Sequence, residues 1–494
     1  MRRARLDSVE AGLLVRAMYR FETVNCLPIF VCALSTLPLW GQQAPPSPDH
    51  AWPVPQNARF QAELAQVPAM TRAVPNPSQL YSLPELVDIA ERNNPETRVL
   101  WEQSKQKAAA AGIARGALFP TVAALASASL SQYSIFVTKF YHEDLATFPA
   151  TLSLSYTVFD FGARGAKIDQ AKANLLAADF AFNDVHRKII FQVVDAYYRL
   201  LDAISQGEAA QATLTDAQTV QQAIEARLAN GLATLPDVLE ARAAAAQAQY
   251  ELVSTHGLEE IARGVLANVL GVNPAAPLDV EDVSKTLLPQ TLEESVKTVI
   301  ERSLGQRPGL LSQVAQLRYA DAGIREARSA FYPTVGFSGE WGHRNSYGSQ
   351  NSNPTISSQI YPYSVQLNLN WTVFDGGTRR NQVARAEAQY RQAQAQVAVS
   401  RDQIENEIWT SYSKLKTAQE QKKAADTLLE AAEQSYSAAT ESFQAGVRTF
   451  IDVTTAQRDL ARARTAQATA RIQVLTSLAD LAFRAGDPIR AAQH

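Results

Sequence analysis

The stretch WTVFDGGTRR, residues Trp371 to Arg380, decides the fold because the chain nearly repeats it. From Tyr156 to Gly165 the sequence reads YTVFDFGARG, which shares six of its ten letters at a spacing of 215 residues. Both stretches combine an aromatic residue, a β-branched pair, Phe-Asp and glycine. The same unusual turn used twice, so far apart, indicates two copies of one structural unit.

The repeat extends beyond this turn. AGIARGALFPTV at Ala111 is echoed by AGIREARSAFYPTV at Ala322, and RLANGLATLPDVLEA at Arg227 by SFQAGVRTFIDVTTA at Ser442. Each copy has a helix, an aromatic-Pro pair, strands and a very long helix, in that order. We therefore predict two tandem repeats, with these parts: a first repeat over 83–273 containing a β-hairpin at 119–161, a linker over 274–290, and a second repeat over 291–485 containing a β-hairpin at 332–375.

The regions outside the repeats have a different composition. Residues 1–44 contain the run VNCLPIFVCALSTLPLWG, which is too short and Pro-interrupted for a membrane helix and predicts a secretory signal peptide, with Met18 as an alternative start. Lipidation at Cys26 or Cys32, the only cysteines, is a further alternative. We expect a Pro-rich leader over 45–82 and a short tail over 486–494.

Strand-like sequence precedes the repeated turn. From Tyr361 to Val373 the odd positions carry apolar side chains and the even positions mostly polar ones, and similar alternation surrounds Trp341 and Tyr156. Alternation over about ten residues, with aromatic residues at both ends of the apolar face, is required of a lipid-facing barrel strand. A half-buried hairpin of a soluble protein shows the same pattern, so the strands alone leave both interpretations open.

The helices favour the membrane interpretation. From Thr378 to Ala445 there is no Gly or Pro, which allows about 100 Å of helix, and the first copy has only Gly207 between Ala166 and Asn230. Both runs are rich in Ala and Gln with apolar residues at three-four spacing, which is typical of coiled coils. Each ends at a glycine and is followed by a returning helix, over Pro236 to about Val269 and Thr449 to about Arg484. A soluble globular protein has no use for helical hairpins of this length, so we expect them to project away from the strands.

The repeated turn then marks the corner where a strand becomes a long helix. Gly162, Gly376 and Gly377 supply backbone freedom there, and Asp160 and Asp375 can cap exposed helix N–H groups. Amphipathic rings settle at the membrane-water boundary, where we expect five aromatic residues: Tyr156, Tyr361, Tyr363, Trp371 and Trp341.

Four strands per chain cannot close a transmembrane barrel, because unpaired strand edges in lipid cost several kcal/mol per group. Three chains supply twelve strands. The expected fold is an α+β membrane protein: a homotrimeric, 12-stranded transmembrane β-barrel surrounded by outer-membrane lipid and continued by a long α-helical coiled-coil barrel.

The chain resembles the outer-membrane efflux proteins, the TolC-like exit ducts of Gram-negative tripartite pumps. The resemblance covers Leu83 to about Arg484 and rests on LPELVDIAERNNPETRVLWEQSKQKAAAAGIARGALFPTV, the corners TVFDFG and TVFDGG, and the tips NGLATLPDV and AGVRTFIDV. It implies a trimer in the outer membrane that projects into the periplasm. It also implies a periplasmic adaptor (membrane fusion) protein and an inner-membrane transporter of RND, ABC or MFS type, which delivers substrates for passive exit.

In this family the periplasmic tips dock the adaptor and form an iris. The resemblance places docking at these positions: Gly231, Leu232, Ala233, Thr234, Gly446, Val447, Arg448 and Thr449. Asp452 matches an acidic position that forms a carboxylate ring, and Arg448 and Asp237 match a polar link that holds the iris shut. Phe443 stands where some relatives have Tyr, and Thr455 where a second acidic ring would lie.

Local chemistry offers a second role for the tip residues. Asp237 and Asp452 each follow a Thr by three residues, which is the spacing of a helix-capping box. Capping and gating are compatible roles for both acids. Arg448 is alternatively a solvated tip residue.

No enzyme signature appears in the sequence. The six histidines are scattered and there is no P-loop, so we expect no catalytic residue, no metal site and no cofactor. A formal charge of −3 provides no basic field for nucleic acid. Two alternatives to an exit duct are a stand-alone passive porin, which lacks long projections, and a soluble coiled-coil scaffold, which does not need the aromatic-flanked strands.

Overall fold

The computed structural model describes residues 62–63, 65–66, 79–136, 140–282, 295–350 and 353–486. The predicted signal peptide, most of the predicted leader, part of the linker and the tail after Gly486 lie outside these residues. The chain divides into two units, Met1–Ala69 and Met70–His494, and the strands and long helices all lie in the second.

Each half begins with two short helices separated by a bend. These are α4 (Leu83–Asn93) and α5 (Pro95–Gly116) in the first half, and α8 (Val296–Gln306) and α9 (Pro308–Ser329) in the second. Pro95 and Pro308 occupy the first turns of α5 and α9, where the missing N–H of proline costs no helix hydrogen bond. The residue before each proline is extended rather than helical, because the proline ring clashes with a helical predecessor.

Two long helical hairpins follow the strands. They consist of α6 (Ala163–Ala229) with α7 (Leu235–Val269), and α10 (Thr378–Gln444) with α11 (Phe450–Ala485). The predicted long helices are confirmed to within a few residues, and α6 and α10 have 67 residues each, about 100 Å of helix. Gly207 does not interrupt α6, because a single glycine costs only about 1 kcal/mol in a helix that is held by packing.

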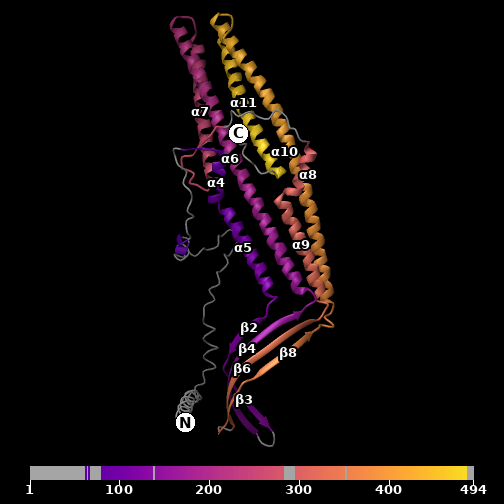
Figure 1. The fold of residues 1–494 in the computed structure, drawn as a ribbon. Coiled ribbons are helices and arrows are strands. Elements are labelled where there is room, and N and C mark those ends of the chain that lie inside the picture. The colour runs from indigo at the N-terminus through magenta and orange to yellow at the C-terminus, as the bar shows by residue number, and fades with distance from the viewer. Residues whose placement is uncertain are drawn as a thin grey trace, which may run out of the picture. The chain divides into compact units, whose positions relative to one another are not determined.

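The helices form one layer in which α6 and α10 run the full length (Figure 1). Near the sheet, α5 packs on α6, α6 on α9, and α9 on α10. Further from the sheet, α7 packs on α6, α6 on α11, and α11 on α10. Many of the buried residues along these helices are alanine, which allows the helices to approach closely. The layer therefore has two outer helices at every level, with α10 always one of them.

The sheet is antiparallel and lies at the opposite end of the helical layer from the hairpin tips (Figure 1). Its central strands are β4 (Phe140–Phe159) and β6 (Thr334–Gln350). β2 (Thr121–Ala126) and β3 (Ser129–Phe136) pair one after the other along the outer edge of β4, and β8 (Tyr363–Asn370) and β7 (Asn353–Ile360) do the same along β6. Six strands thus occupy four positions across the sheet.

The strand before the second corner is shorter than the predicted alternation. Tyr361 and Trp371 lie outside β8, which spans Tyr363–Asn370. Pro362 separates β7 from β8 because it has no N–H for the ladder, although its carbonyl accepts a hydrogen bond from Gly342 N at 3.0 Å.

A two-stranded parallel sheet, which the sequence did not predict, joins the beginning of the first half to its end. It pairs β1 (Leu80–Tyr81) with β5 (Asp279–Val280). Tyr81 falls in the stretch expected to be leader, yet its side chain is buried in an apolar cluster with residues of α4, α6 and α7. Two-residue strands carry no periodicity, so only the tertiary pairing reveals them.

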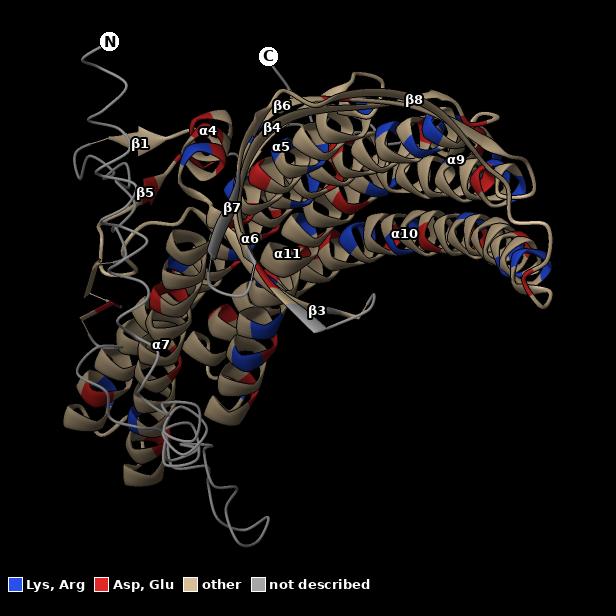
Figure 2. Cartoon of the chain, turned by 90° about the horizontal axis from the view of Figure 1, so that it is seen from below, with Lys and Arg blue, Asp and Glu red and all other residues tan. Residues whose placement is uncertain are grey.

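Charged residues are concentrated on the helices. Figure 2 shows Lys, Arg, Asp and Glu spread along the helical layer, whereas the strands consist almost entirely of other residues. Within the described residues, no helix has a stretch long and apolar enough to cross a lipid bilayer.

Candidate functional site

The strand register gathers the apolar residues onto one face of the sheet. Leu367 of β8 lies opposite Phe337 of β6, which lies opposite Tyr156 of β4. The next rows continue this face: Val365, Gly339, Leu154 and Val122, then Tyr363, Trp341, Leu152 and Ala124. Leu367 is 71% exposed and Tyr363 80% exposed. The chain by itself therefore leaves a broad apolar face uncovered.

The predicted aromatic residues lie toward the two ends of this face. Tyr363 and Trp341 face each other across β8 and β6, and Tyr361 lies beside His343 with ring centroids 4.9 Å apart. At the corner end, the Trp371 indole donates a hydrogen bond to Phe331 O at 3.1 Å. The nine residues from Tyr363 to Trp371 are separated by eight steps and span about 26 Å if extended, which is comparable to the apolar band of about 25 Å in outer-membrane barrels.

The two corners have the same hydrogen bonds. In the first, the Asp160 carboxylate accepts from Gly162 N at 3.2 Å, Arg164 N at 2.8 Å and Arg164 Nε at 2.9 Å. In the second, Asp375 accepts from Gly377 N at 3.1 Å, Arg379 N at 2.9 Å and Arg379 Nε at 2.8 Å. The predicted capping role of both aspartates is confirmed.

The arginine of each corner also binds two other elements. Arg164 donates to Ala117 O after α5 at 3.3 Å and to Val158 O in β4 at 3.4 Å. Arg379 donates to Ala330 O after α9 and to Val373 O, both at 3.4 Å. One guanidinium thus joins a strand end, the end of the preceding helix and the start of the long helix. This role was not predicted from the sequence, although the arginine is one of the six residues that the two stretches share.

The corner backbone requires glycine, as predicted. Gly162, Gly376 and Gly377 have φ of 88°, 65° and 87°. Phe161 takes the place of Gly376 in the first copy, with a φ of 50°. The Phe161 ring stacks on the Tyr332 ring, with ring centroids 4.8 Å apart. This contact offsets part of the energetic cost of the left-handed conformation of Phe161.

The corner carboxylates are held in their charged form. Partial burial pushes the pKa of Asp160 upward, but hydrogen bonds from Arg164 and the charge of that residue outweigh burial and hold the pKa below its usual range. Hydrogen bonds from the Arg379 N–H and guanidinium likewise lower the pKa of Asp375. Both ion pairs therefore persist at neutral and mildly acidic pH.

The hairpin tips contain the predicted capping boxes. Asp237 accepts from Thr234 N at 2.9 Å and from Thr234 Oγ1 at 2.6 Å, and Asp452 accepts from Thr449 N at 3.0 Å and Thr449 Oγ1 at 2.8 Å. Hydrogen bonds from Thr449 are the main cause of a lowered pKa of Asp452, to which the charge of Arg448 adds. The capping role is confirmed for both acids, and the gating role stays a prediction.

The remaining predicted gate residues lie near the same tips. Phe443 packs against Phe450, with ring centroids 5.7 Å apart, and the Arg227 guanidinium lies 4.7 Å from the centre of the Phe443 ring. Within the described residues of one chain, no ion pair joins Arg448 to Asp237. The predicted link between Arg448 and Asp237 stays a prediction, and it requires contact between copies of the chain.

A different acid links the two hairpins within the chain. Glu240 of α7 accepts a hydrogen bond from Thr454 Oγ1 at 3.0 Å and lies 3.9 Å from the Arg458 guanidinium, both on α11. Glu240 was not predicted from the sequence, because its only signal there is a position about one helical turn after Asp237. In the tip loops, Leu232 and Val447 are largely exposed. Within the described residues, no cluster of His, Cys, Asp and Glu could hold a metal ion.

Comparison with known proteins gives a consistent result. The family described as outer membrane efflux protein matches residues 86–272 and 299–487. Protein CyaE of Bordetella pertussis is 30% identical over 391 residues, which cover 78% of this chain and 76% of that protein. The pyoverdine export outer membrane protein OpmQ of Pseudomonas putida is 26% identical, over 74% of each chain.

Solved structures share the fold. The outer membrane protein VceC from Vibrio cholerae superimposes with a TM-score of 0.70 at 23% identity, covering 83% of this chain and 97% of that one. The open state of the MtrE outer membrane channel of Neisseria gonorrhoeae gives a TM-score of 0.66 at 20% identity, covering 83% and 91%.

Proposed function

The chain belongs to the outer membrane efflux protein family, and from that premise we propose that three copies form one continuous duct through the outer membrane and into the periplasm. The protein acts in the outer membrane as the exit channel of an efflux or export system. The family match to two separate segments supports a tandem repeat with the predicted boundaries.

The observation that carries the proposal is a sheet with an exposed apolar face and two edges that pair with no other strand among the described residues. β2 and β3 form one edge and β7 and β8 the other. Each unpaired backbone group would cost several kcal/mol in lipid. Pairing the edges of neighbouring copies removes this cost, and three copies of four strand positions close a twelve-stranded barrel with the apolar face toward lipid.

The helical layer supports the same assembly. Its outer helices are α5 and α7 on one side and α10 on the other, so a neighbouring copy can place α10 against α5 and α7. These helices expose large apolar side chains: Val99, Trp101, Leu239, Tyr250, Val253, Val399 and Trp409. One threefold rotation axis therefore closes both the β-barrel and the helical tube.

The partners follow from the architecture. A duct without an energy source needs an inner-membrane transporter, and the tips are the end that points away from the outer membrane. We assign Gly231, Leu232, Gly446 and Val447 to docking of a periplasmic adaptor, and we assign no catalytic activity to the chain. Relatives named for pyoverdine export, cation efflux and alkaline protease secretion all match this chain in sequence, and we therefore infer that the transporter selects the cargo.

The test is cell fractionation combined with a mass measurement. We expect the full-length protein in the outer membrane, a detergent-solubilised mass of three chains, and capture of an adaptor that is lost on Gly231→Glu or Gly446→Glu. A monomer that stays in solution without detergent contradicts the duct. A membrane trimer that captures no adaptor indicates a stand-alone porin.

A further inference from the structure

Charged residues are rare in the sheet, and one of them differs from the rest. The six strands carry Glu143 and Asp144 in β4 and Glu340 and Arg344 in β6, and Arg344 is their only lysine or arginine. A charge on a membrane-spanning sheet is costly unless it faces water, so such a residue marks a functional position.

The alternation along β6 decides which face its two charged residues share. Trp341 belongs to the apolar face, so the even-numbered positions of β6 belong to the opposite face, which lines the lumen of the proposed barrel. Glu340 is on that face, opposite Ser153 of β4 and Ser364 of β8. Arg344 is on the same face, four residues further from the helices.

Neither charged side chain has a partner within the chain. Arg344 and Glu340 are exposed, and among the described residues neither side chain forms an ion pair or a hydrogen bond. The two residues are about 13 Å apart along an extended strand, and Gly342 between them has no side chain. Pro149 and Ile360, which lie opposite Arg344, offer it no side-chain acceptor.

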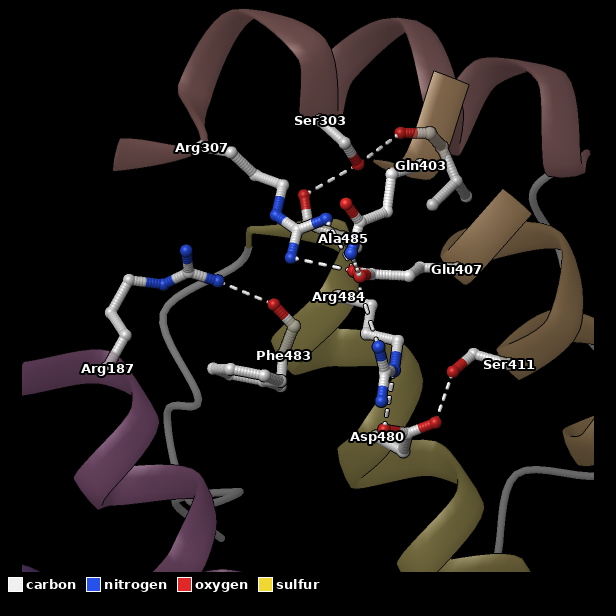
Figure 3. Close-up of polar contacts among 11 residues, drawn as sticks. Arg187, Ser303, Arg307, Gln403, Glu407, Ser411, Asp480, Phe483, Arg484 and Ala485 are labelled. Carbon is white, nitrogen blue, oxygen red and sulfur yellow. Dashed lines mark hydrogen bonds and ion pairs between the residues drawn. The ribbon is translucent and has the colours of Figure 1, made fainter. Parts of the chain in front are cut away.

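This isolation sets Arg344 apart from arginines that hold elements together. On the helices, Arg307 donates two hydrogen bonds to Glu407, both at 3.0 Å, and Arg484 lies 3.3 Å from the same carboxylate (Figure 3). At the corner, Arg164 pairs with a carboxylate as well. The guanidinium of Arg344 holds no other element, so it is available to a solute.

The two β6 charges lie on either side of the aromatic row formed by Tyr363 and Trp341. Glu340 precedes Trp341 by one residue, and Arg344 follows it by three. In the proposed duct this row lies at the outer boundary of the membrane, because the helices begin at the other end of the sheet. Three copies then place three glutamates just inside the outer mouth and three arginines at the mouth.

The size of the proposed barrel lets these charges act on a passing solute. Twelve strands about 4.8 Å apart and tilted by about 40° give a backbone diameter of about 24 Å. Long side chains that reach inward from three copies leave every point of the bore within about one Debye length, or about 8 Å at physiological salt, of a charge.

The charged positions are far enough apart to act separately. The Glu340 and Arg344 levels are about 10 Å apart along the barrel axis, which exceeds the Debye length. Glu143, on the lumen face of β4, lies six residues beyond Pro149 and therefore about 15 Å further out than Arg344. A solute that leaves the duct thus meets one level of positive charge between two of negative charge.

We propose that Arg344 forms a ring of three guanidinium groups at the outer mouth, which favours the exit of anionic solutes and opposes the entry of cations from outside. This inference rests on the proposed trimeric duct. Rings of arginine are typical of pores for anions and phosphate, and the planar guanidinium binds carboxylate and phosphate groups through two parallel hydrogen bonds. The favoured solutes are therefore those that carry carboxylate or phosphate groups.

The test measures the reversal potential of the full-length trimer in planar bilayers under a KCl gradient with about 0.15 M salt on the concentrated side. Arg344→Gln should lower the permeability of chloride relative to potassium about two-fold, because it removes the positive ring. Arg344→Lys is the matched control, since it keeps the charge, and it should leave this ratio unchanged. Glu340→Gln should raise the ratio, because it removes the neighbouring negative ring.

Two further conditions sharpen the test. Replacing chloride by inorganic phosphate examines the proposed class of solute, and Arg344→Gln should again lower the permeability of the anion relative to potassium. In a gradient whose dilute side holds about 1 M salt, where the Debye length is about 3 Å, the difference between Arg344→Gln and the parent should disappear.

Four results would overturn the ring: an unchanged ratio in a conducting Arg344→Gln trimer, the same loss in Arg344→Lys, a loss that persists at about 1 M salt, or an effect on chloride without one on phosphate. If Arg344→Gln does not assemble, Ser346→Glu decides, because it places a carboxylate on the same face two residues away and should lower the ratio equally. Failure of the duct is recognised separately, since the parent protein would then form no channel.

Discussion

The corners and the tips of this molecule use the same residue type for opposite purposes. Asp160 and Asp375 sit at the starts of α6 and α10, and Asp237 and Asp452 at the starts of α7 and α11, each pair 215 residues apart. All four accept hydrogen bonds at a helix N-terminus. The corner acids also bind a guanidinium that reaches two further elements, whereas the tip acids bind only their capping Thr within the described residues of one chain.

This difference shows where the chain is held and where it is left free. In the proposed duct, a corner keeps one angle between a strand in lipid and a helix in water, which suits an aspartate tied through its arginine to three elements. A tip of that duct meets other copies or a partner, which suits an aspartate that binds only its own helix. Substitutions should therefore have their largest effects in the sheet, where the constraint is greatest, and their smallest at the tips.

The largest effect is expected on the apolar face of the sheet. Leu367→Arg should cost about 2–4 kcal/mol and prevent trimer assembly, because it puts a charge into lipid. Gln366→Arg is the matched control on the opposite face, where Gln366 lies opposite Ser338. Heat-resistant trimer on gel electrophoresis is the measurement. Loss of trimer in Gln366→Arg but not in Leu367→Arg would mean that the lipid and lumen faces are inverted.

The second largest effect is expected at the corner between β4 and α6. Asp160→Ala should lower the stability of the trimer by about 1–3 kcal/mol, because it leaves the half-buried Arg164 without its carboxylate. Arg164→Ala should have a similar effect, and the double variant should cost less than the sum, which a double-mutant cycle in thermal unfolding measures. Asp452→Ala, at the tip, should have the smaller effect. Equal losses at corner and tip would remove the distinction between the two regions.

Much of this architecture is readable from sequence because it depends on periodicity and repetition. The long helices follow from Gly- and Pro-free runs with three-four spacing, and α10 begins at the predicted Thr378. The aspartate caps follow from spacing alone, since each binds groups within four residues. The family match extends this from the fold to location and activity.

What the sequence did not reveal depends on contacts between distant segments. The guanidinium of Arg164 meets Ala117 O, 47 residues away, and Glu240 meets Thr454, 214 residues away. The strand β1 was missed because two residues have no period. The contacts of Glu407 with Arg307 and Arg484 were also missed, because these charged residues resemble solvated helix positions until α8, α10 and α11 are brought together.

At the tips, a conductance measurement tests the predicted iris. Arg448→Ala with Asp237→Ala should raise single-channel conductance in planar bilayers about two-fold or more, if the two side chains link neighbouring copies and hold the iris narrow. Thr234→Ala is the control, because it removes the hydroxyl that Asp237 accepts from but keeps its charge. Unchanged conductance in a folded double variant removes the iris assignment, and an equal rise in Thr234→Ala attributes the effect to the lost cap.

The smallest effect concerns the pH dependence of Asp452, which separates its two roles. In one chain, hydrogen bonds from Thr449 lower the pKa of this carboxyl, so the stabilisation by its cap is complete above the unfolded pKa, near 4, and is lost only as the pH falls through the still lower folded value. Three Asp452 carboxylates brought together on the trimer axis repel one another, which raises their pKa values instead. Capping alone therefore predicts a flat conductance from pH 8 down to about pH 4.5, whereas a carboxylate ring predicts a decrease in that range as protonation removes the repulsion. We expect the decrease, and we expect Asp452→Asn to abolish it. A flat profile in the parent protein would leave Asp452 as a cap and move the constriction elsewhere on the tips.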